Sequence, residues 1–277
     1  MSATPEWETK SGDAWSERWQ DIDRALSGLG AMLNRAIAAS APKGAFRALD
    51  VGCGAGSTSL ALANIRPDAT IIACDLSPAL VGIAEERFAG TSVHALLGDA
   101  EAVAQGEGPF DLVFSRHGVM FFADPVRAFR SLRAAASAGA SLVFSCFQDW
   151  QSNPWASELA SAAANRALPP PGREPSGFAF ADSHYVREIL DSAGWTDVEG
   201  TPVAFNYVAA AEGGAIEQAL SFLGAIGPAS RVVEEMPEQE KPSAVERMRS
   251  VIERHFTGDA VEFAAAAWIW SAKAGDA

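Results

Sequence analysis

The segment Asp50-Val-Gly-Cys-Gly-Ala-Gly56 combines an acidic residue with glycines at alternate positions, Gly52, Gly54 and Gly56. Glycine permits sharp turns and lets a ligand approach the backbone closely. A helix that begins directly after such a loop offers unpaired N–H groups at its positive end. A dinucleotide loop has the spacing Gly-x-Gly-x-x-Gly, and Asp50 would repel a pyrophosphate there. The loop therefore favours a ligand that carries an ammonium group, although a glycine turn without a ligand is the alternative.

Two more acidic residues follow the next two predicted strands. Asp75 ends the second strand, where a carboxylate can accept hydrogen bonds from ribose hydroxyls. Asp99 follows the third strand, where it can accept from an adenine amino group while the Ala100 N–H faces a ring nitrogen. Alone, Asp75 could cap a helix and Asp99 could stabilise a turn. Three acids after three successive strands, around a glycine loop, together predict a nucleoside site.

A polar trio, Ser115, Arg116 and His117, follows the fourth predicted strand. Because ligands of open α/β sheets bind beyond the carboxyl ends of the strands, we expect at least one of the three to face the cleft. His117 is the best candidate for a general base, since the usual pKa of imidazole lies near neutrality. A packed or surface histidine is the alternative. Arg116 could clamp a substrate carboxylate or pair with an acid of the protein itself.

Tryptophan is unusually frequent, with eight copies. Trp15 and Trp19 lie one turn apart on a predicted helix, and Trp150 and Trp155 flank the loop after the fifth strand. An aromatic face beside a sulfonium or a cationic acceptor would contribute an attraction of about 0.5–2 kcal/mol. Packing between a cap and the core is the alternative for each of these side chains.

The elements that position these residues are strands and helices in strict alternation. Ahead of them, residues 12–40 carry apolar side chains at spacings of three and four, which predicts an amphipathic helix. Strands separated by helices imply βαβ units and a parallel, doubly wound sheet. The predicted strands are residues 46–51, 69–74, 93–97, 110–115 and 141–147, and the predicted helices between them are residues 57–65, 78–88 and 125–136.

The pattern changes after residue 150. Helices are predicted over residues 153–167, 182–193, 213–226 and 243–257, and strands over residues 198–208 and 261–271. The helices 213–226 and 243–257 stand where a short hairpin could have joined the two strands. We expect them, with the N-terminal helix, to cap the carboxyl edge of the sheet.

Composition restricts the partners of the protein. A net charge of −14 would repel nucleic acids and anionic membranes, and no Lys/Arg run opposes it. The three cysteines are odd in number and fall in predicted strands or strand ends, which indicates reduced thiols. We find neither a signal-peptide pattern nor an apolar run of the about 18 residues needed to span a membrane. These features predict a cytoplasmic protein with a small-molecule substrate. The four histidines are scattered and predict no metal site.

With these motifs the chain resembles the class I S-adenosylmethionine-dependent methyltransferases. Residues 48–56 are similar to the first motif of that family, residues 73–77 to the second and residues 98–100 to the third. The resemblance implies S-adenosyl-L-methionine as cofactor and a seven-stranded Rossmann-like sheet whose last strand is antiparallel. The cofactor-binding residues that it implies are Asp50, Gly52, Cys53, Gly54, Asp75, Leu76, Asp99, Ala100, Ser115 and Trp15.

A closer resemblance is to a bacterial subgroup similar to the ubiquinone/menaquinone methyltransferases. Its marks here are residues 12–15, 114–125, 153–155 and 178–182. The subgroup more often has an apolar residue where His117 stands and Trp where Phe147 stands, so the acceptor cannot be taken over from a relative. We expect the acceptor to contact Trp19, Trp150, Asn153 and Trp155, with His117 and Arg116 as the catalytic candidates.

The sequence thus predicts methyl transfer to a small molecule by in-line displacement, in which the protein aligns the nucleophile and excludes water. A non-catalytic S-adenosylmethionine-binding protein and a nicotinamide-dependent dehydrogenase are the two alternatives. We expect one integrated domain made of an N-terminal helical cap (residues 1–40), a cofactor-binding core (41–150), and a third part (151–277) with a lid helix, the remaining core strands and a helical insertion. The methylated atom and the oligomeric state are left open.

Overall fold

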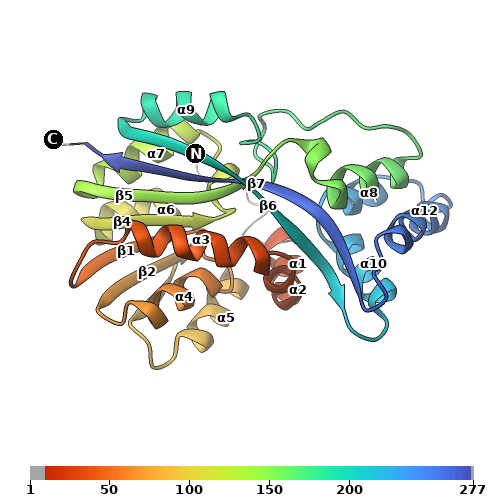
Figure 1. Cartoon of the computed structure of the whole chain (residues 1–277), viewed down its shortest axis with the longest axis horizontal. Helices are drawn as coiled ribbons and strands as arrows, with labels where there is room; N and C mark the ends of the chain where they lie inside the picture. Colours follow the sequence, from red (N-terminus) through yellow and green to blue (C-terminus); the bar gives the residue numbers. More distant parts are fainter. Residues whose placement is uncertain (1–9, 276–277) are drawn as a thin grey trace.

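The structure is a computed structural model that describes residues 10–275, and it contains a seven-stranded sheet (Figure 1). The strand order is β3-β2-β1-β4-β5-β7-β6, and β7 runs antiparallel to both neighbours. This confirms the predicted doubly wound sheet with an antiparallel last strand. The strands are β1 (Phe46–Val51), β2 (Ala69–Asp75), β3 (Val93–Leu97), β4 (Phe110–Arg116), β5 (Ala136–Phe147), β6 (Trp195–Ala211) and β7 (Ala260–Ala274).

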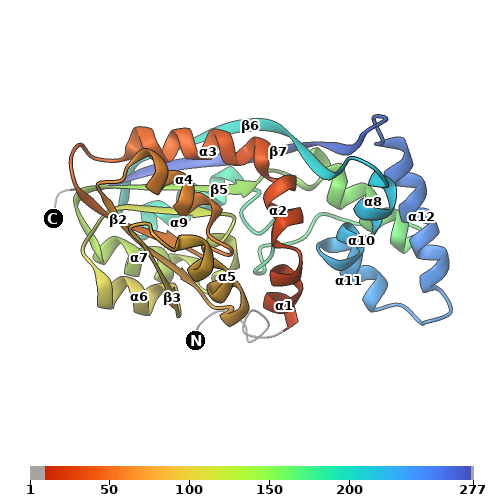
Figure 2. The same cartoon turned by 90° about the horizontal axis from the view of Figure 1, so that it is seen from below.

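Helices cover both faces of the sheet, as Figure 2 shows for α3 and α7. Strand β4 illustrates the consequence, because Leu112 and Phe114 pack into the apolar cluster on one face while Val113 packs into the other. A strand buried on both faces has a nearly continuous apolar sequence. The helices of the first face are α3 (Ser27–Ser40), α4 (Ser57–Ile65) and α5 (Pro78–Phe88), and those of the second are α6 (Ala100–Glu107), α7 (Pro125–Ala134) and α9 (Ser183–Ser192).

Side-chain caps fix where several helices begin. Ser77 accepts a hydrogen bond from the Leu80 N–H ahead of α5, and Asp124 accepts one from the Arg127 N–H ahead of α7. In both helices a proline occupies the first turn, where its missing N–H costs nothing.

The N-terminal segment differs from the single predicted helix. It forms α1 (Lys10–Glu17), α2 (Trp19–Ala25) and α3, with non-helical backbone at Arg18 and Leu26. The breaks let each piece pack on a different element, since α1 lies against α5, α2 against β6, and α3 against α4 and the sheet. Residues 1–9 of the predicted cap lie outside the described residues.

Strands β6 and β7 continue past the carboxyl end of β5 and form a two-stranded arm (Figure 1). In this arm residues 204–211 pair with residues 260–266, whereas β5 pairs only with residues 267–273 of β7. The arm carries α10 (Ala215–Ala225), α11 (Pro228–Glu234) and α12 (Lys241–Arg254), and α8 (Pro154–Ala164) packs against α11 and α12. The short helices α6 and α11 were not predicted. Among residues 10–275, no helix combines the length and apolar character that crossing a membrane requires.

Candidate active site

A cavity of about 120 Å³ lies over the glycine loop, at the carboxyl ends of β1, β2, β3 and β4. Most of the predicted cofactor-binding residues line it together. They are Gly52, Cys53 and Gly54 of the loop, Asp75 and Leu76 after β2, Asp99 and Ala100 after β3, and Trp15 of α1. Arg116, His117 and Trp19 also line it.

The glycine loop needs its glycines for conformational and steric reasons. Gly52, Gly54 and Gly56 all have positive φ angles, of 65°, 55° and 82°. A Cβ on Gly56 would lie 2.3 Å from the ring of Phe88. Since residues with a Cβ rarely adopt this backbone conformation, the alternating glycines determine the path of the loop.

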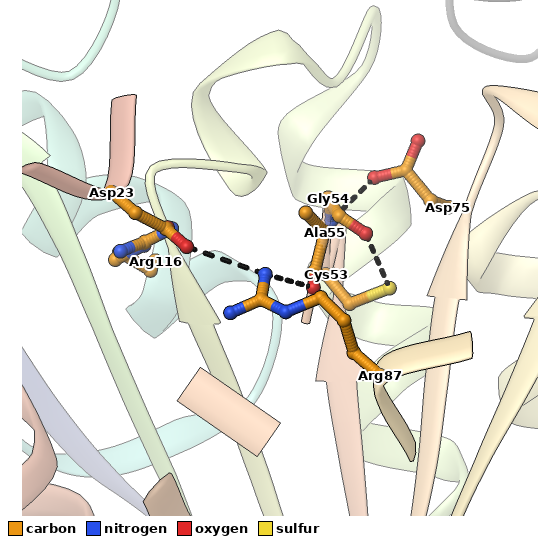
Figure 3. Close-up of polar contacts among 7 residues, drawn as sticks. All are labelled: Asp23, Cys53, Gly54, Ala55, Asp75, Arg87 and Arg116. Carbon is orange, nitrogen blue, oxygen red and sulfur yellow. Dashed lines mark hydrogen bonds and ion pairs between the residues drawn. The ribbon is translucent and has the colours of Figure 1, made fainter. Parts of the chain in front are cut away.

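Asp75 fastens the loop to the end of β2 (Figure 3). Its Oδ2 accepts a hydrogen bond from the Gly54 N–H at 2.8 Å, and its Oδ1 accepts one from the Ser77 N–H at 2.9 Å. Burial raises the pKa of Asp75, while these N–H donors act in the opposite direction. Asp99 likewise accepts from the Glu101 N–H at 2.9 Å and caps α6. Both carboxylates therefore have a structural role and still line the cavity.

Two of the predicted cofactor-binding residues, Asp50 and Ser115, do not line the cavity. The Ser59 hydroxyl donates to Asp50 Oδ2 at 2.7 Å, and Asp50 Oδ1 is buried without a partner among the described residues. Burial raises the pKa of Asp50 to about 7. The Ser115 hydroxyl donates to the Val51 carbonyl at 2.7 Å and accepts from the Gly118 N–H at 3.1 Å. Ser115 thus joins the ends of β1 and β4.

Ion pairs centred on Asp23 of α2 close one side of the cavity (Figure 3). Arg116 Nη2 lies 2.7 Å from Asp23 Oδ1, and Arg87 Nη1 lies 3.3 Å from Asp23 Oδ2. Arg87 also donates to the Ala55 carbonyl at 2.5 Å and lies over the ring of Trp19, 4.3 Å from its centroid. These contacts tie α2 to the glycine loop, and pairing with an acid is one of the two roles considered for Arg116.

A second, larger cavity of about 900 Å³ adjoins the first. The two have five lining residues in common: Trp15, Ile22, Leu26, His117 and Phe121. The predicted acceptor-binding residues Trp150 and Trp155 line the second cavity, whereas Trp19 lines only the first. Asn153 lines neither, because its side chain is buried and bonded to the backbone of Asp149 and Ala266 and to the Trp155 indole.

His117 stands between the two cavities as a neutral imidazole. Its Nδ1 lies 2.8 Å from Ser145 Oγ, and its Nε2 is buried without a partner among the described residues. Burial, and after it the positive charge of Arg116, lower the pKa of His117 to about 3. An imidazole with so low a pKa can accept or donate a hydrogen bond, but it is a weak base at neutral pH.

Comparison with known proteins agrees with this geometry. Residues 48–139 match the family model described as a methyltransferase domain. The malonyl-[acyl-carrier protein] O-methyltransferase of Herminiimonas arsenicoxydans is 30% identical over 54% of this chain and 53% of its own length. The ubiquinone biosynthesis O-methyltransferase of Methylococcus capsulatus is 34% identical over 47% of this chain and 56% of its own length. The chain thus spans about half the length of these curated relatives.

A solved structure extends the comparison to nearly the whole chain. The phosphoethanolamine N-methyltransferase 2 of Haemonchus contortus, in complex with S-adenosylhomocysteine, matches with a TM-score of 0.54 and 17% identity. The match covers 98% of this chain and 58% of that one. The chain has the class I methyltransferase fold. As the identity is low, this likeness concerns the fold alone, and the chemistry has to be argued from the residues.

Within this methyltransferase fold, much of the second cavity was not predicted. Phe121 belongs to the short helix η1 (Val119–Phe121) after β4, and its position after the polar trio was a usable signal. Phe178 and Tyr207 also line the cavity, as do residues 224–234 around α11. Phe147, which departs from the subgroup near the expected pocket, lines it as well. These residues come from separate elements that only the tertiary structure brings together.

Proposed function

We propose that the protein transfers a methyl group from S-adenosyl-L-methionine to a small-molecule acceptor. The observation that carries this proposal is the common wall of the two cavities. One cavity has the glycine loop and the acidic residues suited to the cofactor, and the other has an aromatic lining suited to an acceptor. The cofactor's methyl group would lie at the wall formed by Trp15, His117 and Phe121.

In the cofactor cavity, Asp75 would accept hydrogen bonds from the ribose hydroxyls, and Asp99 with the Ala100 N–H would contact the adenine. Each Asp75 oxygen already accepts one backbone hydrogen bond and retains a lone pair for a second. In its ionised form, which predominates above about pH 7, Asp50 would favour the ammonium group of the cofactor through its charge.

The reaction would be a single in-line displacement. A lone pair of the acceptor atom forms the new bond to the methyl carbon while the carbon–sulfur bond breaks and its electron pair stays on sulfur. The products are S-adenosylhomocysteine, the methylated acceptor and, where the acceptor atom carried a hydrogen, one proton released to solvent. The protein contributes by aligning the two molecules and excluding water.

Calorimetric titration with S-adenosyl-L-methionine tests the proposal. Asp75→Ala should weaken binding by about 1–3 kcal/mol, because it leaves hydrogen-bond partners of the cofactor unsatisfied. Asp191→Ala, at an exposed acid of α9, is the matched control and should leave the affinity unchanged. Unchanged affinity in Asp75→Ala would remove Asp75 from the cofactor site.

Mass spectrometry of reactions with a panel of acceptors separates the alternatives. Formation of S-adenosylhomocysteine together with a methylated acceptor supports the proposed activity. Cofactor binding with no acceptor methylated would favour a non-catalytic binding protein. Tight binding of NAD without binding of S-adenosyl-L-methionine would favour a nicotinamide-dependent dehydrogenase.

A further inference from the structure

Three residues that line the second cavity each have a buried polar atom with no hydrogen-bond partner among the described residues. These atoms are His117 Nε2, Trp150 Nε1 and Ser176 Oγ. Buried polar groups are nearly always hydrogen-bonded, because an unmade bond leaves the cost of desolvation uncompensated. Three such atoms beside one cavity are the groups that a bound molecule with matching donors and acceptors would satisfy.

The backbone of His117 is fixed in an uncommon conformation by its contacts with β1 and β5. Its φ angle of 59° lies in the left-handed region, which is uncommon for a residue with a side chain. The His117 N–H donates to the Ser145 carbonyl at 3.2 Å. The next residue, Gly118, is pressed against β1, where a Cβ would lie 2.6 Å from the Val51 carbonyl oxygen. Strained conformations of this kind persist where the surrounding structure over-determines them, often at functional sites.

The side chain of His117 is oriented as firmly as its backbone. Ser145 Oγ engages Nδ1 at 2.8 Å, and the ring stands edge-on to Phe147 with centroids 4.2 Å apart. The Nδ1 contact leaves Nε2 as the atom available to a ligand, either as donor or as acceptor according to the tautomer. Ser145, buried in β5, therefore acts on the ligand only through the imidazole.

The interior of this cavity is aromatic and carries no charge among the described residues. A chain of ring contacts leads from His117 through Phe147 and Phe178 to Trp150, with centroid distances of 4.2, 5.4 and 5.1 Å. The charged residues of the lining, Arg166, Arg231 and Glu234, are exposed, which places them at its mouth. A charged group carried into the interior would lose its hydration without meeting an opposite charge.

We propose that the second cavity takes an uncharged aromatic acceptor with at least two hydrogen-bonding atoms. His117 Nε2 bonds the atom to be methylated, and Trp150 Nε1 donates to a second atom across the aromatic surface. Ser145 is the positioning residue that sets the tautomer of His117. This inference rests on the proposed function, since it names the acceptor class of the same site.

Binding of three probes of one shape tests the acceptor class. They are 2,7-dihydroxynaphthalene, 2-naphthol and 2-naphthoate, titrated by calorimetry into the protein saturated with S-adenosylhomocysteine. The dihydroxy compound should bind about five- to tenfold more tightly than 2-naphthol, as one added hydrogen bond allows. The anionic 2-naphthoate should bind most weakly. Equal or tighter binding of 2-naphthoate would overturn the proposal.

Variants of His117 separate its two nitrogens. His117→Asn keeps a polar atom at the level of Nδ1 and tolerates the left-handed backbone, but it lacks Nε2. His117→Asn should abolish the tighter binding of 2,7-dihydroxynaphthalene relative to 2-naphthol, and Trp150→Phe should do the same. His117→Gln places an amide near the level of Nε2 and should restore part of that advantage. If all three variants keep the wild-type ratio of affinities, these atoms do not recognise the acceptor.

The role of Ser145 has a spectroscopic readout. The chain has four histidines, so the imidazole nitrogens of His117 can be assigned by NMR. His117 should show one dominant tautomer, and Ser145→Ala should shift its tautomer ratio. A purely structural role of Ser145 would lower stability and leave that ratio unchanged.

Two different results would show that the proposed function is wrong or that only the proposed acceptor class is wrong. Absence of S-adenosylhomocysteine binding in the wild type would refute the methyltransferase proposal. Methyl transfer to charged acceptors, with S-adenosylhomocysteine bound normally, would refute only the acceptor class.

Discussion

The buried carboxyl of Asp50 should make the protein less stable as the pH rises toward neutrality. Its pKa is raised from 3.8 to about 7 in the folded state, chiefly by burial. Between these values the folded state retains a proton that the unfolded state has released, so the free energy of unfolding falls with increasing pH. At about 1.4 kcal/mol for each pKa unit, the full cost above neutrality is about 4 kcal/mol.

Asp50→Asn should remove this cost, because asparagine imitates the protonated carboxyl and can still accept from the Ser59 hydroxyl. The gain in stability over the wild type should grow by about 2 kcal/mol between pH 5 and pH 7. Urea unfolding followed by circular dichroism at pH 5, 6, 7 and 8 measures it as a change in midpoint at constant slope. The contributions of the other titrating groups to the free energy of unfolding largely cancel when the two proteins are compared.

Ser59→Ala provides an opposite perturbation. The Ser59 hydrogen bond lowers the pKa of Asp50, so its removal should extend the decline in stability to higher pH. Parallel pH profiles for the wild type and Asp50→Asn would refute the reasoning, since they would mean that Asp50 titrates alike in the folded and unfolded states.

Three further predictions concern the ion pairs of α2, the second cavity and the glycine loop. Asp23→Asn breaks the ion pairs that hold α2 against the glycine loop, so S-adenosyl-L-methionine should associate faster in stopped-flow fluorescence. Added salt should increase the association rate of the wild type and leave that of the variant unchanged, because salt screens the ion pairs. Trp155→Ala removes a buried ring stacked on Tyr207 at 4.5 Å and should lower the free energy of unfolding by about 3–5 kcal/mol in urea titrations; a loss below 1 kcal/mol would contradict that packing. Gly56→Ala should lower the free energy of unfolding by about 1–3 kcal/mol through backbone strain. Adding Phe88→Ala should relieve the clash between the new Cβ and the Phe88 ring. If Gly56→Ala leaves the stability unchanged, the loop tolerates a side chain.

The parts of the molecule that sequence predicts well are those set by neighbours along the chain. The glycine loop, the strand ends at Asp75 and Asp99, and the caps Ser77 and Asp124 all follow from local backbone preferences. Because parallel strands end at one edge, their terminal residues had to meet there. Eight of the ten predicted cofactor-binding residues therefore line one cavity.

Sequence could not predict how side chains are used once distant elements meet. The predicted acceptor contact Asn153 is bonded to the Ala266 backbone, 113 positions away in the chain. Asp50 is turned toward Ser59, and Ser115 toward Val51, instead of lining the cavity. The pKa of His117 likewise depends on burial that no local pattern reveals. Such outcomes depend on tertiary packing, which overrides local tendencies.

The two cavities draw much of their lining from different stretches of the chain, and the arm of β6 and β7 carries part of the lining of the second. The cavity over the glycine loop is lined by residues 15–122, whereas the second cavity draws much of its lining from residues 147–234. Ala211 and Ala260 are paired at the tip of the arm, so the two ends of the inserted segment lie close together. The inserted helices also contribute buried side chains, such as Phe222 and Ile252, to the core. A different insertion would therefore change the lining of the second cavity and leave the glycine loop as it is, provided that it supplies apolar side chains at the same places in the core.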